Sequence, residues 1–337
     1  MNPLARIAAE LFSTPLFLDA RKAATIAAVL GNRVGVDGER LEALARAFGP
    51  PLASRPAARG RSGNGYAKIG GGIALVPVIG SLVTRAGGLD AESGLISYDT
   101  ISRAVREANY DPEVTSILLD VHSPGGAATG AIECADVIGN IAKKRPVVAV
   151  SNSVCCSAAY AIAAAANKIV VTPTSMTGSV GVVMLHLDRS QQLADHGLVP
   201  TFIHAGAHKV DGNELQPLSA EVKADLQQEV DGFYGLLVAS VASHRPKLSP
   251  AAIKGTEART YLGAQAVAVG LADEVGSIDT VIQELAGLHK EAGETWSKYD
   301  KIERLYGANS ASAERLKDAH AAGVRAGAAA TLAASKR

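Results

Sequence analysis

The sequence predicts an α/β fold with a parallel sheet and crossover helices. Short β-branched apolar runs alternate with helical patterns from residue 67 to about residue 287, and this alternation indicates parallel strands joined by helices. Alanine, valine, isoleucine and glycine are abundant, whereas aromatic residues make up only 4% of the chain. This composition favours closely packed α/β layers, and no segment of 20–50 residues repeats.

Four segments differ in composition. An amphipathic pattern predicts an N-terminal helical region over residues 1–49, and a stretch rich in proline, glycine, serine and arginine predicts a flexible linker over 50–66. Residues 67–287 carry the strand and helix alternation and form the main domain. Residues 288–337 are polar and alanine-rich, which predicts an exposed helical tail.

Within the main domain, each element follows from its local pattern. Apolar β-branched runs predict strands, and amphipathic or alanine-rich runs predict helices. The predicted strands are 73–79, 115–121, 147–151, 168–171, 180–185 and 201–204. The predicted helices are 97–109, 127–142, one that starts at Ser157, one that ends at His196, and 219–244.

Charge and cysteine content exclude several classes of protein. Lysine plus arginine equals aspartate plus glutamate at 33 each, which argues against a general nucleic-acid surface. Cys134, Cys155 and Cys156 include an adjacent pair, so we expect reduced thiols in a cytosolic protein and no zinc site. Charged residues interrupt the N-terminal apolar residues, and no run reaches the ~18–20 apolar residues of a membrane span. We therefore expect a soluble protein without a signal peptide.

One stretch dominates the sequence. A buried strand from Val147 leads into Ser157, and an almost purely apolar helix follows it. A serine at this junction has two interpretations. Its hydroxyl caps the helix, which is the commoner role, or it is a nucleophile beside free N–H groups that would hold an oxyanion.

Three glycine-containing turns accompany this serine. They are Ser123-Pro-Gly-Gly126, Thr177-Gly-Ser179-Val-Gly181 and Gly206-Ala-His-Lys209. Each alone is an ordinary turn, and the first lacks the Gly-Lys-Ser/Thr ending of a phosphate-binding loop. Lys209, if buried, would have a pKa below its ordinary value of about 10.4, and a neutral amine is a general base for serine.

Three histidines are candidates for a metal site or for a general base. His204 and His208 are four residues apart, but Gly206 lies between them after a predicted strand, so we expect no metal site. His186 is a candidate base for a Ser/His/Asp arrangement, although a structural role at a strand end is the commoner one.

Together these motifs resemble the signal peptide peptidase A family of Ser/Lys peptidases, over about residues 70–285. The matching pieces are the three turns, Cys156-Ser-Ala-Ala-Tyr160, and Arg259-Thr-Tyr-Leu-Gly263 with the run to Gly276. His208-Lys-Val-Asp-Gly-Asn213 and the region Ser13–Asp19 resemble the head-maturation (capsid assembly) proteases of lambda-like phages in particular. The resemblance implies a Clp-protease/crotonase-like fold.

The resemblance also implies roles. Ser157 would be the nucleophile, Lys209 the general base and Ser179 the group that orients the lysine. Backbone N–H groups of Gly125, Gly126 and Ala158 would form the oxyanion hole. The chain departs from the bacterial peptidases at Ala158-Ala159, where they typically carry two glycines.

The implied activity is a serine endopeptidase without metal or cofactor, assembled as a homo-oligomeric ring in which neighbouring subunits can complete a site. Its substrates would be capsid scaffold and portal proteins, and the chain itself, inside assembling proheads in the cytoplasm of the bacterial host. Self-cleavage would fall in 50–66 or after Leu288.

Three other interpretations remain open. The first is a Clp-type peptidase that uses Ser157, His186 and an aspartate. The second is a crotonase-like acyl-CoA enzyme, which is disfavoured because such enzymes bring carboxylates to the reacting carbon. The third is a non-enzymatic capsid scaffold or assembly protein on the same fold.

Overall fold

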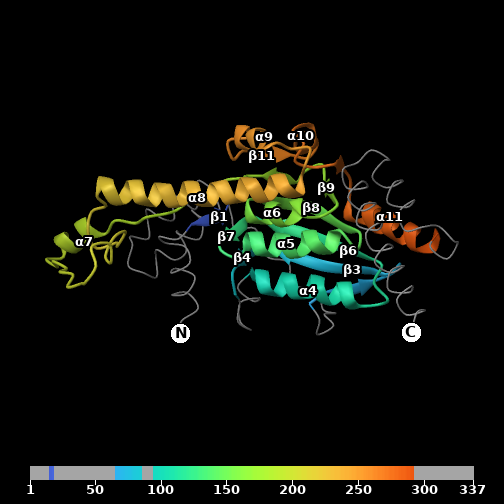
Figure 1. The fold of residues 1–337 in the computed structure, drawn as a ribbon, viewed down its shortest axis with the longest axis horizontal. Helices are drawn as coiled ribbons and strands as arrows, with labels where there is room; N and C mark the ends of the chain where they lie inside the picture. Colours follow the sequence, from blue (N-terminus) through green and yellow to red (C-terminus); the bar gives the residue numbers. More distant parts are fainter. Residues whose placement is uncertain (1–14, 19–64, 86–93, 292–337) are drawn as a thin grey trace, which may run out of the picture.

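The computed structural model describes residues 15–18, 65–85 and 94–291 (Figure 1). These residues form an α/β fold with a mainly parallel sheet and crossover helices, as predicted. The predicted linker lies almost wholly outside the described residues, as do most of the N-terminal region and most of the tail. Tyr66 is an exception, because it is buried and its hydroxyl donates to Asp111 Oδ2 over 2.8 Å. The main domain therefore includes the last residue assigned to the linker.

The main sheet has eight strands around a parallel centre. Strands β3, β6 and β8 are parallel neighbours, β9 and β10 both pair with β8, and only β2 and β11 run antiparallel to their partners. The strands are β2 Ala67–Ile69, β3 Ile73–Ile79, β6 Ser116–Ser123, β8 Val147–Cys156, β9 Lys168–Val171, β10 Met176–Gly178, β11 Thr260–Leu262 and β12 Glu274–Val275.

A second sheet of four short strands lies beside the carboxyl ends of β3 and β6. Its order is β1-β7-β4-β5, and only β1 is antiparallel to its neighbour. The strands are β1 Leu16–Leu18, β4 Ser81–Val83, β5 Leu95–Ser97 and β7 Gly125–Ala127. This sheet carries the predicted glycine loop, and it becomes important for the site.

The helices cover the two faces of the main sheet unequally. Helices α4, α5, α6 and α8 contribute to one large apolar core, whereas α11 packs with a smaller cluster on the other face. The bounds are α4 Tyr98–Tyr110, α5 Ala131–Ala142, α6 Ala158–Ala164, α7 Ser190–Asp195, α8 Ala220–His244, α9 Pro250–Gly255, α10 Ala264–Ala268 and α11 Ile278–Glu291.

Period-two alternation in β6 explains why both faces are apolar. Ile117 and Leu119 lie in the large core, whereas Leu118 between them lies in the smaller one. Successive side chains of a strand point to opposite faces, so a strand buried on both faces has no polar positions to spare. The first residue of β2, Ala67, pairs with Leu75 of β3. Among the described residues β2 therefore does not reach Pro77, and a proline without an N–H is tolerated there.

Four local predictions were wrong. Residues 16–18 form a strand and not a helix, and 125–127 form strand β7, so that α5 begins only at Ala131. Residues 180–185 and 201–204 are not strands. The physical reason is pairing: a strand needs a neighbour, and apolar composition alone does not supply one. Val183 makes only an isolated bridge, to Leu16 of β1.

An arm projects from the body of the molecule. It comprises residues 190–232, which include α7, the loop that follows it and the first half of α8 (Figure 1). At 1.5 Å per residue the 25-residue α8 is about 37 Å long, and its buried residues (Leu237, Val238, Ser240 and Val241) all lie in its second half. The first half of α8 therefore extends beyond the domain.

Candidate active site

Ser157 occupies a sharp turn between β8 and α6. Its backbone has φ 56° and ψ −117°, which is rare for a residue with a side chain. The backbone N–H donates to Gly178 O over 2.8 Å, and the hydroxyl donates to Gly181 O over 3.2 Å. The hydroxyl makes no capping bond to α6. The structure therefore removes the capping interpretation and leaves a strained, buried serine beside a neighbouring loop.

Burial argues against the cysteines beside this serine as nucleophiles. Cys155 and Cys156 are both buried at the end of β8. Burial raises the pKa of the Cys155 thiol well above its ordinary value, and burial likewise raises the pKa of Cys134 to about 12. Since the thiolate is the reactive form, these cysteines contribute packing, and Ser157 is the reactive candidate of this stretch.

The predicted glycine loop lies directly against the serine. A Cβ built on Gly125 would be 3.0 Å from Cys156 O and 2.1 Å from Phe17 O, and Gly125 has φ 101°. A Cβ on Gly126 would be 1.8 Å from Leu82 O of β4. Only glycine fits at either position, because backbone atoms of two segments crowd Gly125 and those of Leu82 crowd Gly126. The Gly125 N–H donates to Ser123 Oγ over 3.2 Å.

The predicted lysine-orienting residue is also close to the nucleophile. Gly178 pairs with Cys156 across β10 and β8, so Ser179 lies one residue beyond the strand pair that precedes Ser157. Ser179 has φ 50° and its N–H donates to Arg259 O over 2.9 Å. The structure thus brings together Ser157, Ser179, Gly125, Gly126 and Ala158, from three segments far apart in the sequence.

Lys209 is not part of this group within one chain. It is exposed, and it lies in the turn after Gly206, whose carbonyl accepts its backbone N–H over 3.2 Å. This turn belongs to the arm, which extends away from α6 in Figure 1. Ser157, by contrast, is buried in the body. The predicted dyad is therefore not assembled by a single copy in this conformation.

The three histidines considered as metal ligands or as a general base contact groups outside the Ser157 site. His186 Nε2 is 3.1 Å from Asn213 O, and His204 Nδ1 is 3.0 Å from Gly206 O. His208 is 2.8 Å from Asp211 Oδ2, which raises its pKa. His208, Asp211 and Asp225 lie close enough together to offer ligand atoms to one cation, and no other such group of three occurs in the described part of the chain. All three are exposed.

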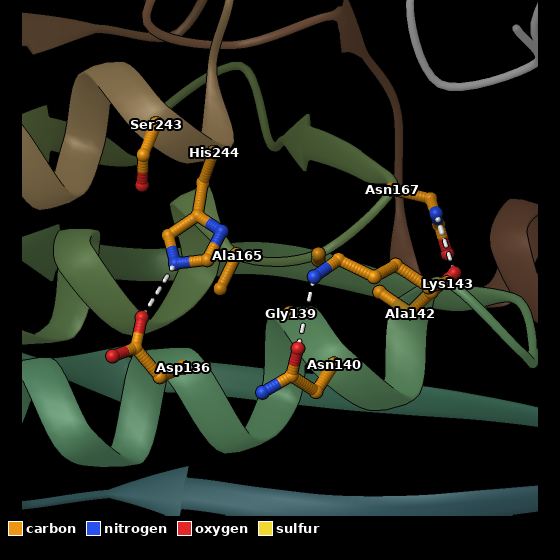
Figure 2. A pocket seen from close by; sticks show the side chains of 10 residues that line it. Asp136, Gly139, Asn140, Ala142, Lys143, Ala165, Asn167, Ser243 and His244 are labelled. Atoms are coloured by element: carbon orange, nitrogen blue, oxygen red, sulfur yellow. Dashed lines mark hydrogen bonds and ion pairs between the residues drawn. The ribbon is translucent and has the colours of Figure 1, made fainter. Parts of the chain in front are cut away.

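The cavity in Figure 2 is separate from this site. It has a volume of about 230 Å³ and lies between α5, the residues that follow α6 and the end of α8. His244 Nε2 is 3.4 Å from Asp136 Oδ1, and Lys143 Nζ donates to Asn140 Oδ1 over 2.9 Å. None of the predicted site residues lines it, because it lies at the opposite end of α6 from Ser157.

Sequence reasoning missed one participant. Strand β1 pairs with β7 in the register Phe17 with Gly126 and Leu18 with Gly125, so the N-terminal segment reaches the glycine loop. The resemblance had marked residues 13–19, but the local pattern indicated a helix. Nothing in the pattern could have indicated a pairing across more than a hundred residues.

Comparisons with known proteins place similar sequences among peptidases and phage head proteins. Residues 140–292 match the model of Peptidase family S49. The chain is 38% identical to "Head-tail preconnector protein GP5" of Enterobacteria phage P21 over 84% of this chain and 57% of that protein. It is 36% identical to "Capsid assembly protease C" of Escherichia phage lambda, over 83% of this chain and 65% of that protein.

A bacterial relative points to the same family. "Putative signal peptide peptidase SppA" of Enterococcus faecium is 30% identical over 54% of this chain and 53% of that protein. The chain thus spans somewhat more than half of the length of each of these relatives. No helix in the described ranges is long and apolar enough to cross a membrane.

Proposed function

Since residues 140–292 match the model of Peptidase family S49, we propose that the chain is a serine endopeptidase of this family whose nucleophile is Ser157. The observation that carries this proposal is the strained turn at Ser157, buried against a loop where only glycine fits. Strain of this kind persists where the surrounding structure holds it, and it clusters at active sites. The hydroxyl has no capping role that would account for it.

The general base in this proposal is Lys209 of a second copy of the chain. Lys209 is exposed on the projecting arm, whereas Ser157 lies in the body. The first half of α8 has no buried residue, and an arm of this kind, which projects from the body of the domain (Figure 1), is suited to reach a neighbour in a ring. Large apolar side chains exposed on it support the same view, notably Val199 and Ile203.

The proposed reaction is acyl transfer. The neutral amine of the neighbour's Lys209 removes the Ser157 hydroxyl proton as the oxygen attacks a peptide carbonyl carbon. The ammonium then gives that proton to the departing amine, and an acyl-enzyme remains. Water, deprotonated by the same amine, attacks the ester, and the ammonium returns that proton to the Ser157 oxygen as the acid leaves.

Three parts of the site would support this chemistry. Ser179 would hydrogen-bond the incoming amine, and the N–H groups of Gly126 and Ala158 would hold the oxyanion. The Gly125 N–H donates to Ser123 Oγ in this conformation. It would contribute to the oxyanion hole only after exchanging that partner.

The phage relatives support a proposal for the substrates and for the place where they are cut. A capsid assembly protease and a head-tail preconnector protein are similar to this chain over most of its length. We propose that the substrates are capsid scaffold and portal proteins, cut within assembling proheads in the bacterial cytoplasm. Self-cleavage at residues 50–66 or after Leu288 belongs to the same proposal.

The test compares intact masses after incubation with scaffold and portal proteins. Wild type, Ser157→Ala and a matched control, Ser153→Ala, would be used. Ser153 lies four residues earlier on β8, where its hydroxyl contacts His122 Nδ1. We expect cleavage by wild type and Ser153→Ala, and none by Ser157→Ala. Cleavage by Ser157→Ala would remove the assigned nucleophile, and no cleavage by any variant in the assembled state would favour a scaffold protein.

A further inference from the structure

Strand β1 fills a slot between two backbone edges of the site. On one side is β7, the glycine strand, whose other edge is taken by β4. On the other side is Val183, just after the loop that accepts the Ser157 hydroxyl: Leu16 N donates to Val183 O over 2.9 Å, and Val183 N donates to Leu16 O over 3.0 Å. Without β1, both edges would face an open slot beside Ser157.

The register of β1 brings one carbonyl to the proposed oxyanion hole. Ala128 N donates to Pro15 O over 3.3 Å, whereas Leu16 directs its N–H and carbonyl to Val183. Hydrogen-bonded and non-bonded pairs alternate in antiparallel ladders, so Phe17 and Gly126 form the next hydrogen-bonded pair. The Gly126 N–H, one of the proposed oxyanion donors, therefore faces the Phe17 carbonyl.

The same carbonyl also lies near the residue that precedes the nucleophile. Phe17 O and Cys156 O both lie within 3.0 Å of one point, the Cβ position of Gly125. Cys156 is the residue before Ser157. The Phe17–Leu18 peptide thus lies where an extended substrate backbone would have to lie in order to reach Ser157 and Gly126 together.

We propose that residues 15–18 occupy the substrate groove of their own chain and must leave it before a protein substrate binds. This inference rests on the proposed function, because it identifies the occupant of the same site. The strand is only three residues long. It adds to an exposed edge in the way that peptides bind by strand addition, where main-chain bonds give affinity and side-chain pockets give specificity.

The side chains of β1 indicate which substrates would replace it. Phe17 is fully buried, with its ring centroid 6.3 Å from that of Phe233 on α8 in an edge-to-face arrangement, and Leu16 is also buried. Leaving the groove would expose both apolar side chains, at a cost that an incoming segment must offset by burying its own. The groove would therefore select extended segments with a large apolar residue opposite Gly126.

The test locks β1 in place with a disulfide. Leu16 and Ala127 are opposite each other and not hydrogen-bonded to each other, which is the closer type of antiparallel pair and suits a disulfide. Leu16→Cys and Ala127→Cys would be combined in a Ser157→Ala background, so that no peptide is cleaved. The single-cysteine variants, treated with the same oxidant, are the controls.

The probe is a fluorescent peptide with the sequence of residues 13–19, and its binding is measured by anisotropy. We expect no binding to the oxidised double variant, recovery on reduction, and at least tenfold tighter binding when Phe17→Ala weakens the occupant. Equal affinity of the oxidised and reduced forms would overturn the proposal, as would absent binding to Phe17→Ala. Catalysis is not measured, so failure here is distinct from failure of the peptidase assignment.

Discussion

Ser157 and Gly125 hold backbone conformations that depend on each other. Ser157 has φ 56° and Gly125 has φ 101°, and the carbonyl of Cys156 lies between them. The motifs around both residues were recognisable in the sequence, because glycine and serine at such turns have few substitutes. The exact contacts were not predictable, since they join segments about 30 residues apart.

Gly125→Ala tests this interdependence. The new methyl group would meet Phe17 O at 2.1 Å and Cys156 O at 3.0 Å, in a backbone conformation that side chains rarely adopt. We expect turnover to fall at least ~10-fold, because small displacements of reacting groups are costly, and the melting temperature to fall as well. Gly232→Ala, on α8 with open space around it, is the control and should leave both unchanged or slightly raised. Wild-type turnover in Gly125→Ala would contradict the close-approach argument.

At the scale of elements, capped helices were predictable and unpaired strands were not. The α4 and α8 starts fall one residue from prediction, because Ser97 Oγ and Ser219 Oγ each accept a backbone N–H in the first turn. The predicted strand over 201–204 fails because its residues have no partner in the described chain. Helices are set by local bonds, whereas strands depend on neighbours that local sequence does not identify.

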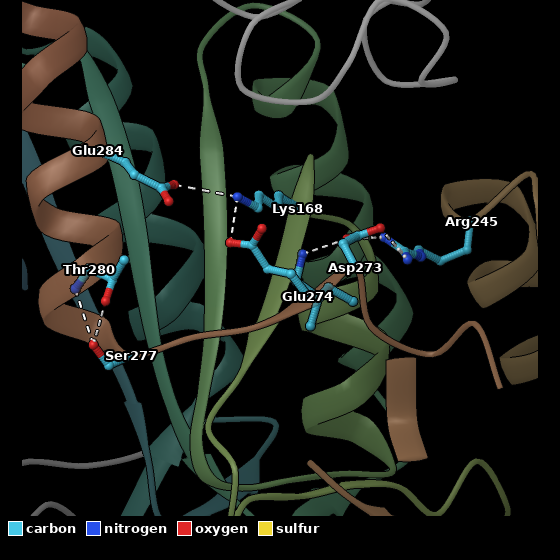
Figure 3. A network of polar contacts seen from close by, with 8 residues as sticks. Lys168, Arg245, Asp273, Glu274, Ser277, Thr280 and Glu284 are labelled. Carbon is cyan, nitrogen blue, oxygen red and sulfur yellow. Dashed lines mark hydrogen bonds and ion pairs between the residues drawn. The ribbon is translucent and has the colours of Figure 1, made fainter. Parts of the chain in front are cut away.

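A partly buried polar network ties the last elements to the sheet. Lys168 on β9 contacts Glu274 on β12 over 2.6 Å and Glu284 on α11 over 3.4 Å (Figure 3). Beside it, Asp273 accepts two bonds from Arg245 at the end of α8, each 2.8 Å, and one from Ile169 N over 2.7 Å. Burial acts to lower the pKa of Arg245, but Asp273 outweighs it and the pKa is raised.

Asp273→Ala should therefore destabilise the fold strongly. It leaves a largely buried guanidinium and the Ile169 N–H without their acceptor. We expect the free energy of unfolding to fall by about 2–4 kcal/mol in chemical denaturation. Glu229→Ala, on the exposed part of α8, serves as control and should change it by less than about 0.5 kcal/mol. A loss no larger than that of the control would show that the network is dispensable.

At the scale of the whole molecule, the projecting arm explains why a single chain does not bring Lys209 to Ser157. It carries Lys209 and exposes Leu198, Val199 and Ile203, the last 99% exposed. An apolar segment that pairs with no strand among the described residues is the feature that misled the strand prediction at 201–204. In the proposed assembly, these exposed apolar residues contact a neighbouring copy, and no local sequence pattern reveals such a contact.

Ile203→Asp should weaken assembly without unfolding the domain. A charge in the proposed contact would have to be buried without a partner. We expect a shift toward monomer in light scattering coupled to size exclusion, with unchanged melting temperature of the isolated chain. Tyr110→Asp, at another highly exposed large side chain, on α4, should assemble as wild type does. Identical assembly of both variants would remove the arm from the interface.

The most direct test of the account asks whether Ser157 and Lys209 act from different copies. Ser157→Ala and Lys209→Ala chains would be coexpressed in equal amounts, and the cleavage of a scaffold protein measured. In a random mixture, about a quarter of the sites would pair an intact Ser157 with a neighbour's intact Lys209. If two copies share each site, each variant alone is inactive and the mixture regains about a quarter of wild-type turnover. A mixture as inactive as either variant alone would contradict a site shared between two copies.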